Sequence, residues 1–373
     1  MNKKVILSVT NDLVSDQRVH KVCTSLQKWG FDVLLVGRLR RKSPALEKRS
    51  YCVKRMNLLF DKGPLFYMEY NIRLFFFLLF HRADILVAND LDTLCANYIA
   101  SKITGRKLAY DSHEYFTEVP ELVLRKFTQS IWRAIEQWIF PKLQFVYTVN
   151  DSIANAYFTT YKIKPAVIRN FPVKVDETII TRSKTDLLLP KDKKIILYQG
   201  AVNIDRGLPE VIEAMQFVNN AVLLIIGDGD ILNELKAKIA QLKLNEKVIF
   251  FNRVPFEMLK QYTLHADIGI SLEKDTNLNY RFTLPNKLFD YVHAGVPVLA
   301  SPLDEIKKIF SVFNIGLLID SHAPQHIADK INLMLSDLDK RKVWRENCLA
   351  ASKEYCWQHE ENVLKRIYNS INL

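Results

Sequence analysis

The chain has 373 residues, 49% of them hydrophobic and 25% charged, and a formal net charge of +11. These values are typical of a folded protein with room for two α/β domains, and they exclude a low-complexity chain. The five cysteines show neither a CxxC pair nor the spacing of metal ligands, so we expect reduced thiols in a cytoplasmic protein.

Short apolar runs alternate with longer amphipathic segments in the first half of the chain. We predict strands at residues 4–9, 32–36, 84–88, 107–111, 144–149 and 166–168, and helices at 17–29, 93–104 and 129–140. The first run is too short for a secretion signal and is predicted to be a buried strand. The alternation indicates parallel strands joined by crossover helices, and therefore a doubly wound α/β domain over residues 1–172.

Basic residues are concentrated in this first half. Residues 1–172 hold 26 Lys and Arg against 15 Asp and Glu, whereas the remaining residues hold 26 of each. The excess indicates an anionic partner such as a membrane surface, although a solvated basic surface is the simpler alternative. No aromatic-basic recognition motif accompanies it, so we expect no nucleic-acid partner.

The longest apolar stretch, LFYMEYNIRLFFFLLF at residues 65–80, contains Glu69 and Arg73 and is too short to span a bilayer. Two interpretations stay open: a helix lying in a lipid interface, or a helix buried against the sheet. The first predicts peripheral contact with an anionic membrane at its inner face.

Residues 173–192 are polar and charged, and we predict an interdomain linker there. A second series of strands and helices follows, which predicts another doubly wound domain over residues 190–355. The strands are expected at 194–199, 221–227, 247–250, 267–272, 297–300 and 315–319. Two such domains enclose a cleft, with ligands bound beyond the carboxyl ends of the strands. The segment 356–373 is predicted to be a final amphipathic helix.

The most specific motif is LPNKLFDYVHAGVPVLAS at residues 284–301. Pro285 suits the first turn of a helix, and the backbone N–H groups near Asn286, Lys287 and Leu288 are suited to a diphosphate. Lys287 adds a full positive charge. Asp290, one turn along, is expected to accept hydrogen bonds from a ribose diol.

Two glycine-containing loops follow strands of the same half. In YQGAVNIDRGL, Gly200 allows backbone to approach a phosphate, and Arg206 is expected to pair with phosphate oxygens. In LLIIGDGD, Gly227 is expected to shape the floor of the donor site. Arg253 in FFNRVP follows the next strand and is a candidate for bordering the base.

The first half carries its own polar candidates after strands. LAYDSHE delivers Asp111, His113 and Glu114, and we expect His113 to contact the reacting sugar or the acceptor. Further acceptor-side candidates follow other strands; for one of them, Asp16, capping a helix is the stronger single role. These candidates are Asp16, Arg18, Asp90, Glu114 and Glu118.

Taken in order, these motifs resemble the large retaining glycosyltransferase family 4, whose fold is named GT-B. The similar stretches run from TND and SDQRVHK, through YDSHE and AVIRNFP, to YQGAVNIDRGL, LLIIGDGD and LPNKLFDYVHAGVPVLAS. The resemblance implies two Rossmann-like domains with the last helix returning to the first domain. It also implies transfer of a sugar from a nucleotide diphosphate with retention at the anomeric carbon and without an essential metal.

Residue roles follow from the resemblance. Asp290 takes the ribose-binding acidic position, Arg206 the basic position facing the diphosphate, and His113 the position beside the donor sugar. Arg206 and Lys287 are expected to stabilise the leaving diphosphate electrostatically. We expect a UDP-sugar rather than a GDP-sugar, and a glycan or lipid-linked acceptor in surface polysaccharide synthesis.

The sequence departs from the family pattern in two places. Many members carry two Glu eight residues apart, but Phe282 stands eight residues before Asp290, and neither Glu273 nor Asp275 has that spacing. The Arg that often follows the glycine of the diphosphate loop is Ala201. A noncatalytic nucleotide-sugar-binding protein and a sugar-nucleotide epimerase of the same fold therefore remain as alternatives.

Overall fold

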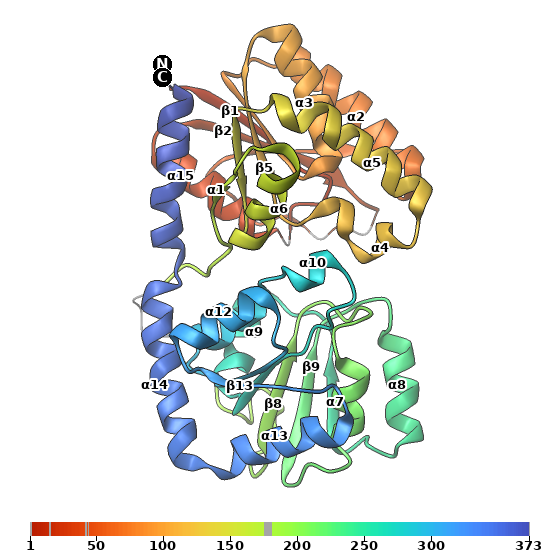
Figure 1. Cartoon of the computed structure of the whole chain (residues 1–373), viewed down its shortest axis with the longest axis vertical. Coiled ribbons are helices and arrows are strands. Elements are labelled where there is room, and N and C mark those ends of the chain that lie inside the picture. The colour runs from red at the N-terminus through yellow and green to blue at the C-terminus, as the bar shows by residue number, and fades with distance from the viewer. Residues whose placement is uncertain (1, 15, 42, 44, 175–180, 373) are drawn as a thin grey trace. The chain divides into compact units, whose positions relative to one another are not determined.

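The computed structural model describes residues 2–14, 16–41, 43, 45–174 and 181–372. The chain forms two compact units, each built around one parallel sheet (Figure 1). The first unit contains Met1–Asn170 together with Glu360–Leu373, and the second contains Phe171–His359. The boundaries differ from the predicted 1–172 and 190–355 mainly in the segment predicted to be a linker.

Within the described ranges, the first unit has a seven-stranded sheet with the order β3-β2-β1-β4-β5-β6-β7, and every neighbouring pair is parallel. The strands are β1 (Lys4–Ser8), β2 (Asp32–Leu39), β3 (Cys52–Asn57), β4 (Ile85–Asn89), β5 (Lys107–Ser112), β6 (Phe145–Thr148) and β7 (Ala166–Val167). The sequence analysis missed β3 because CVKRMN is a largely solvated edge strand without an apolar run. Strand order reverses at β1, so the carboxyl ends of β1 and β4 mark a ligand-binding edge.

The helices of this unit cover both faces of its sheet. They are α1 (Gln17–Lys28), α2 (Gly63–Phe80), α3 (Leu91–Thr104), η1 (Phe116–Glu118), α4 (Pro120–Val123), α5 (Lys126–Ile139), η2 (Phe140–Lys142) and α6 (Asp151–Tyr161). Helices α2, α3 and α5 lie side by side on one face (Figure 1).

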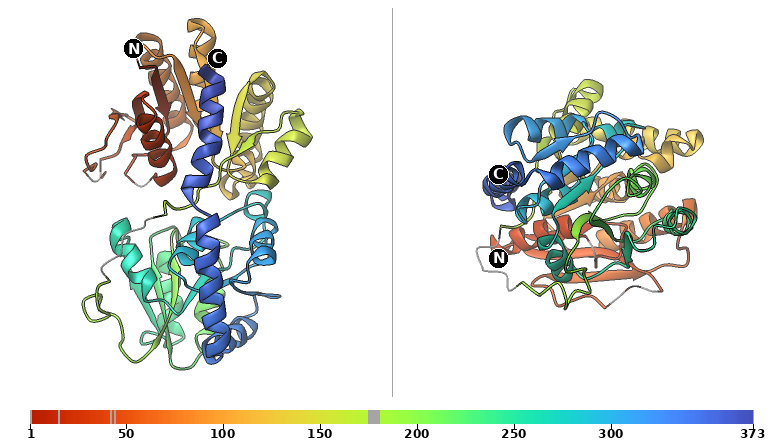
Figure 2. Two further views of the ribbon diagram at one scale, coloured as in Figure 1. Left: turned by 90° about the vertical axis from the view of Figure 1, so that its left-hand side faces the viewer. Right: turned by 90° about the horizontal axis from the view of Figure 1, so that it is seen from below.

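The final helix, α15 (Trp357–Asn372), runs along the first unit (Figure 2). Tyr368 is fully buried, with its ring 5.9 Å from that of Phe31 and its hydroxyl 3.4 Å from that of Tyr147. This contact explains why the last residues of the chain group with the first ones, as the GT-B pattern implies.

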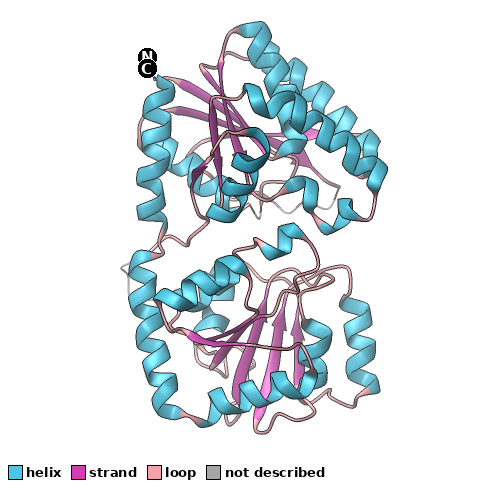
Figure 3. Ribbon diagram, viewed as in Figure 1, coloured by secondary structure: helices cyan, strands magenta, loops and turns pink. Residues whose placement is uncertain are grey.

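In the described part of the second unit, six strands form a parallel sheet in the order β10-β9-β8-β11-β12-β13. They are β8 (Lys194–Gln199), β9 (Ala221–Ile226), β10 (Val248–Phe251), β11 (Ile268–Ser271), β12 (Val298–Ala300) and β13 (Gly316–Leu318). Figure 3 shows them with helices on both sides. Order reverses at β8, which again places a ligand-binding edge at carboxyl ends, here those of β8 and β11.

The helices of the second unit bury one apolar core on each face of its sheet. They are α7 (Leu208–Ala214), α8 (Leu232–Gln241), α9 (Phe256–Leu264), α10 (Leu278–Arg281), α11 (Asn286–His293), α12 (Asp304–Val312), α13 (Pro324–Ser336) and α14 (Leu338–Glu354). Helix α7 contacts both α8 and α13, and α11 contacts α9 and α14. Figure 2 shows α14 in blue along this unit.

The prediction of a linker over residues 173–192 is wrong in its second part. Leu187 and Leu189 are buried and pack in the core of the second unit, whereas Leu188 between them is exposed. The sequence pattern did not reveal that Leu187 and Leu189 are buried, because the neighbouring residues in the sequence are charged. Residues 175–180 of the predicted linker lie outside the described residues.

Candidate functional site

The loops after β8 and β9 pack closely at the carboxyl edge of the second sheet. The amide of Gly200 donates to the Ile226 carbonyl at 3.0 Å, and a Cβ added to Gly227 would lie 1.9 Å from the Gly200 carbonyl oxygen. Gly227 therefore permits the close packing of the two loops, as expected of the floor of a site. A Cβ at Gly200, where φ is +122°, would meet open space, so this backbone is accessible to a ligand.

Three charged side chains meet beyond the ends of β8 and β11. Glu273 is fully buried, and its Oε1 lies 2.7 Å from Lys287 Nζ and 3.4 Å from Arg206 Nη1. Ser271 donates a hydrogen bond to the other carboxylate oxygen at 2.8 Å. The predicted cations Arg206 and Lys287 are thus brought together, with Glu273 between them.

Aromatic rings hold the same two cations from the other side. Lys287 Nζ lies 3.9 Å from the centroid of the Tyr198 ring, and the Arg206 guanidinium carbon lies 4.8 Å from that of Tyr280. Burial opposes ionisation of Glu273, but attraction first by Lys287 and then by Arg206 lowers its pKa to about 2. The cluster carries a net charge of +1 at neutral pH, and the two cations keep further N–H groups for an anionic ligand.

Helix α11 begins at the predicted place. Pro285 precedes its first residue, and the side chain of Asn286 is exposed. The amide of Leu288 donates to the Pro285 carbonyl at 3.1 Å and its side chain is fully buried, so Leu288 anchors the helix. Gln199 at the end of β8 donates to Asp290 Oδ2 at 2.8 Å, which fixes this carboxylate beside the same edge.

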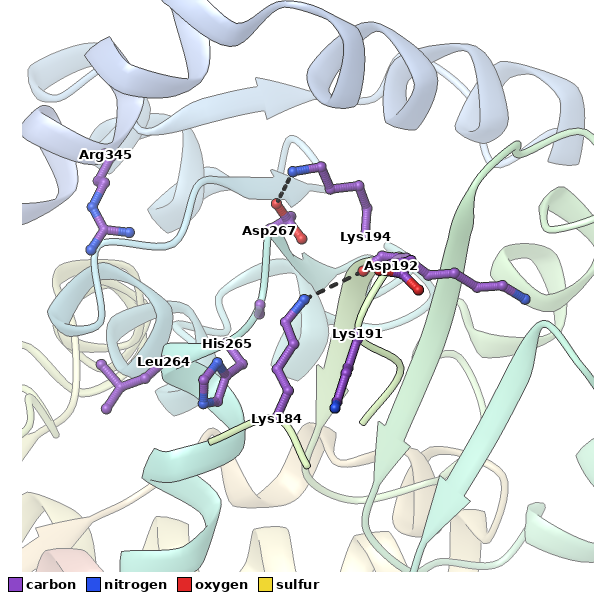
Figure 4. A pocket seen from close by; sticks show the side chains of 10 residues that line it. Lys184, Lys191, Asp192, Lys194, Leu264, His265, Asp267 and Arg345 are labelled. Carbon is purple, nitrogen blue, oxygen red and sulfur yellow. Dashed lines mark hydrogen bonds and ion pairs between the residues drawn. The ribbon is translucent and has the colours of Figure 1, made fainter. Parts of the chain in front are cut away.

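Two other features of the second unit are basic. Arg253 is exposed in the loop after β10. A basic cavity of about 340 Å³, lined by Lys184, Lys191, Lys194 and Arg345 among others, lies near the residues that precede β8 and β11 (Figure 4). Because these are the amino ends of the strands, the cavity is on the opposite edge of the sheet from Glu273.

The first unit has a second buried charge network. Arg18 forms a bidentate pair with Asp111, with Nη2 2.6 Å from Oδ1 and Nε 3.0 Å from Oδ2, and Nη1 donates to the Ile168 carbonyl. His113 Nε2 lies 3.2 Å from Asp111 Oδ2, and its Nδ1 lies 3.3 Å from Asp90 Oδ2. The amide of His113 also donates to Asp90 Oδ1 at 2.8 Å.

These contacts keep His113 charged. Burial lowers its pKa, but the carboxylates of Asp90 and Asp111 outweigh burial and raise the pKa of His113 to about 9. Burial raises the pKa of Asp90 above its usual range, against the attraction of His113. Asp90 also has a φ of +61°, an uncommon conformation for a residue with a side chain, and such strain is concentrated at functional sites.

The other acceptor-side candidates have varied surroundings. Asp16 caps α1 by accepting from the Val19 amide at 3.0 Å, as the simpler interpretation predicted. The Arg18 guanidinium is buried and already donates hydrogen bonds to Asp111 and to the Ile168 carbonyl. Its role is therefore to hold Asp111 in place beside His113. Glu114 is half-buried in the loop after β5, and Glu118 pairs with Arg133 at 2.5 Å.

Sequence reasoning did not assign Glu273, the anion that joins Arg206 and Lys287. Glu273 does not have the eight-residue spacing from Asp290 that the family pattern requires, so that pattern did not identify it. The informative signal was its place two residues after β11, at the same carboxyl edge as the other candidates. In the described part of the chain no group of three or more His, Cys, Asp or Glu is arranged to hold a metal ion.

Two family models match the chain. Residues 16–176 match "Glycosyltransferase Family 4", and residues 180–349 match "Glycosyl transferases group 1". A D-inositol 3-phosphate glycosyltransferase from Xylanimonas cellulosilytica is 24% identical over 207 residues, or 53% of this chain. The match covers 47% of the relative, so this chain spans about half of that relative's length.

Solved structures at low sequence identity share the whole fold. Anabaena HepE in complex with UDP and glucose has a TM-score of 0.77 and 16% identity, with 99% of this chain and 100% of that one covered. WaaG, a glycosyltransferase involved in lipopolysaccharide biosynthesis, has a TM-score of 0.73 and 14% identity, with 97% and 99% covered. The two sheets, their helices and the matched family models agree: this chain is a glycosyltransferase of the family 4 type with the GT-B fold.

Proposed function

We propose that this protein transfers a sugar, with retention at the anomeric carbon, from a UDP-sugar to a glycan or lipid-linked acceptor of a surface polysaccharide. The observation that carries the proposal is the pair of cations joined by Glu273 next to the first turn of α11. A diphosphate is the ligand class that such cations and helix amides favour. The HepE structure with UDP supports a uridine nucleotide, and WaaG supports a polysaccharide product.

In this proposal the second unit binds the nucleotide and stabilises the leaving group. Asp290 accepts hydrogen bonds from the ribose, and the Gly200 backbone and the Asn286 amide approach the diphosphate, with Arg253 bordering the base. As the bond from the anomeric carbon to the diphosphate breaks, negative charge accumulates on the diphosphate. Arg206 and Lys287 offset that charge from fixed positions, which lowers the barrier without a metal ion.

The first unit then supplies the acceptor side. His113 brings its positive charge and its ring to the sugar or the acceptor, while Asp90 and Asp111 hold its two ring nitrogens. The acceptor oxygen attacks the anomeric carbon on the face from which the diphosphate leaves. Its proton passes to an oxygen of the β-phosphate of the departing UDP, so no side chain needs to accept it.

A thermal-shift screen of nucleoside diphosphates and nucleotide sugars tests the donor proposal. We expect UDP or a UDP-sugar to raise the unfolding midpoint, because a ligand that binds only the folded chain stabilises it by mass action. Asp290→Ala is expected to weaken nucleotide binding roughly 10-fold, about the effect of losing one hydrogen-bonded charge. Asp304→Ala, which removes an exposed carboxylate of α12, is the matched control. Absence of any response, or an unchanged affinity in Asp290→Ala, would contradict the assignment.

We further propose that helices α2 and α5 hold the enzyme at an anionic membrane. Helix α2 buries one face, including Tyr70 and Leu74, so the prediction of a helix packed against the sheet holds for that face. The opposite face of α2 exposes large apolar side chains at helical spacing, and α5 exposes further ones. The two helices are in contact, because the ring centroids of Tyr67 and Trp132 lie 5.2 Å apart. The exposed side chains are Leu65, Met68, Ile72, Phe76 and Phe80 of α2, and Phe127, Ile131 and Trp138 of α5.

The basic excess of residues 1–172 makes an anionic lipid surface the matching occupant of this apolar face. None of the described helices has the length and apolarity needed to cross a bilayer. Contact through side chains on one face therefore fits better than insertion of α2.

Co-sedimentation with vesicles of phosphatidylcholine and phosphatidylglycerol tests this surface. The double variant Ile72→Glu/Phe76→Glu is expected to reduce partitioning at least roughly 10-fold, because each side chain contributes on the order of 1–2 kcal/mol when buried in lipid. Leu333→Glu/Val343→Glu in the second unit changes side chains of similar exposure, 46% and 50% against 50% and 51%, and should have no effect. Equal partitioning of both variants would refute the proposal. It would also be refuted if the protein formed a dimer in solution and only Ile72→Glu/Phe76→Glu dissociated that dimer.

A further inference from the structure

Two arginines of the described chain that are wholly or largely removed from water each pair with a buried carboxylate. Arg18 pairs with Asp111 and Arg206 with Glu273, each through its guanidinium. Arg38 is also buried, at 8% exposure, yet within the described residues no carboxylate oxygen lies within 4.0 Å of it. A guanidinium that is removed from water without a directly paired carboxylate is costly, so its retention calls for an explanation.

Protein groups satisfy only part of the Arg38 guanidinium. Nη1 donates to the Asp61 carbonyl at 3.0 Å, and the guanidinium carbon lies 4.2 Å from the centroid of the Phe66 ring. Its Nε is buried and has no acceptor among the described groups. A guanidinium has five N–H donors in a planar fork, and an anion that presents two oxygens to it, such as a carboxylate or a phosphate, fits that fork.

The position of Arg38 places it at the ligand-binding edge of the first sheet. It lies near the carboxyl end of β2, and its amide donates to the carbonyl of Asn11 in the loop after β1. Burial and then repulsion by Arg40 lower the pKa of Arg38, and attraction by Tyr67 and by the more distant carboxylates of Asp61 and Asp12 offsets this only in part. A bound anion would offset both costs, and two neighbouring positive charges favour a dianion over a monoanion.

We propose that Arg38 binds a phosphate group carried by the acceptor. The assignment rests on the proposed function, because it treats the carboxyl edge of the first sheet as the acceptor side. It narrows the acceptor to a phosphorylated molecule, either a soluble sugar phosphate or a lipid whose phosphate lies at the membrane surface.

Inorganic phosphate is the first probe. We use the full chain with Lys287→Met, so that the donor cluster contributes little to phosphate binding, and measure the unfolding midpoint against phosphate at constant ionic strength. Phosphate should raise the midpoint, and adding Arg38→Met should abolish most of that rise. Adding Arg133→Met instead, which removes an equal charge that is paired with Glu118 on α5, should preserve it. Arg38→Lys should give an intermediate response, since it keeps the charge without the fork.

Stability without phosphate separates a ligand site from a structural arginine. Arg38→Met should leave the midpoint unchanged or raise it, because it removes a buried cation that has no carboxylate partner, whereas Arg18→Met should lower it. If Arg38→Met lowers the midpoint as much as Arg18→Met and leaves the phosphate response intact, the inference is overturned. UDP binding measured on chains with native Lys287 is independent of this outcome, so failure here leaves the donor proposal standing.

Two further probes identify the source of the phosphate. Glycerol 3-phosphate binding that depends on Arg38 and exceeds that of inorganic phosphate supports a soluble acceptor. Arg38-dependent binding to phosphatidylcholine vesicles containing phosphatidic acid supports a lipid one. If neither probe nor inorganic phosphate depends on Arg38, the inference fails.

Discussion

Replacing Lys287 with methionine is expected to lower the rate of sugar transfer at saturating donor roughly 100-fold or more. Loss of one preorganised group that stabilises developing negative charge typically costs about 10²–10³ in turnover. Lys287 is 8% exposed and lies 2.7 Å from Glu273, so bulk water does not replace its charge. Arg206→Met should have an effect in the same range, since both cations face one diphosphate.

Loss of stability has to be separated from loss of catalysis in this experiment. Lys287→Met leaves Glu273 buried with Arg206 and Ser271 as its remaining partners, which destabilises the second unit. The double variant Lys287→Met/Glu273→Gln removes the buried charge with its partner and should recover most of the stability. Its turnover should stay low, because the cation is still missing.

Lys274→Met is the matched control for Lys287. Lys274 pairs with Glu210 at 2.6 Å in the same unit and has no role in the cluster, so transfer should be unchanged. Adding EDTA should also leave the wild-type rate unchanged if fixed cations act in place of a metal. Recovery of turnover in the double variant would show that Lys287 acts only by stabilising Glu273.

Arg18→Met is expected to destabilise the protein by about 3 kcal/mol or more, the largest effect on folding that the structure predicts. The substitution leaves the Asp111 carboxylate, which is fully buried, with His113 as its remaining charged partner. It also frees the Ile168 carbonyl close to where the chain leaves the first unit. Urea denaturation at neutral pH measures the change in the free energy of unfolding.

A surface ion pair of the same unit provides the comparison. Lys4 Nζ lies 3.6 Å from Asp32 Oδ2, and the two side chains are 41% and 51% exposed, so Lys4→Met should cost about 1 kcal/mol or less. The double variant Arg18→Met/Asp111→Asn should be more stable than Arg18→Met alone. If Arg18→Met costs no more than Lys4→Met, the buried network does not hold His113 in the way proposed.

The elements that the sequence predicted well are those with an apolar signal. Strands β1, β8 and β9 are continuous apolar runs, and their ends differ from the predictions by one or two residues at most. The edge strand β3 lacks this signal, because one face and one edge of it are solvated. Leu187 and Leu189 also lacked a recognisable signal, because two buried side chains among charged residues do not form an apolar run.

The sequence predicted many of the residues of the site but not the contacts between them. Arg206 and His113 were predicted because each follows a strand, and Lys287 because it lies at the start of a helix; the structure adds the contacts between such residues. Arg18 and Asp111 pair although they are 93 positions apart, and Glu273 in the loop after β11 joins the loop after β8 to helix α11. Such contacts depend on strand order, which local patterns do not contain. The lack of a carboxylate beside Arg38 likewise appears only once its neighbours in space are known.

A crystal structure of the protein with bound UDP tests the central claim most directly. The account predicts the diphosphate at the start of α11, in contact with Arg206 and Lys287, and the ribose at Asp290. A nucleotide bound instead in the basic cavity at the amino ends of the second sheet, or bound with Lys287 still directed only at Glu273 and Tyr198, would contradict it.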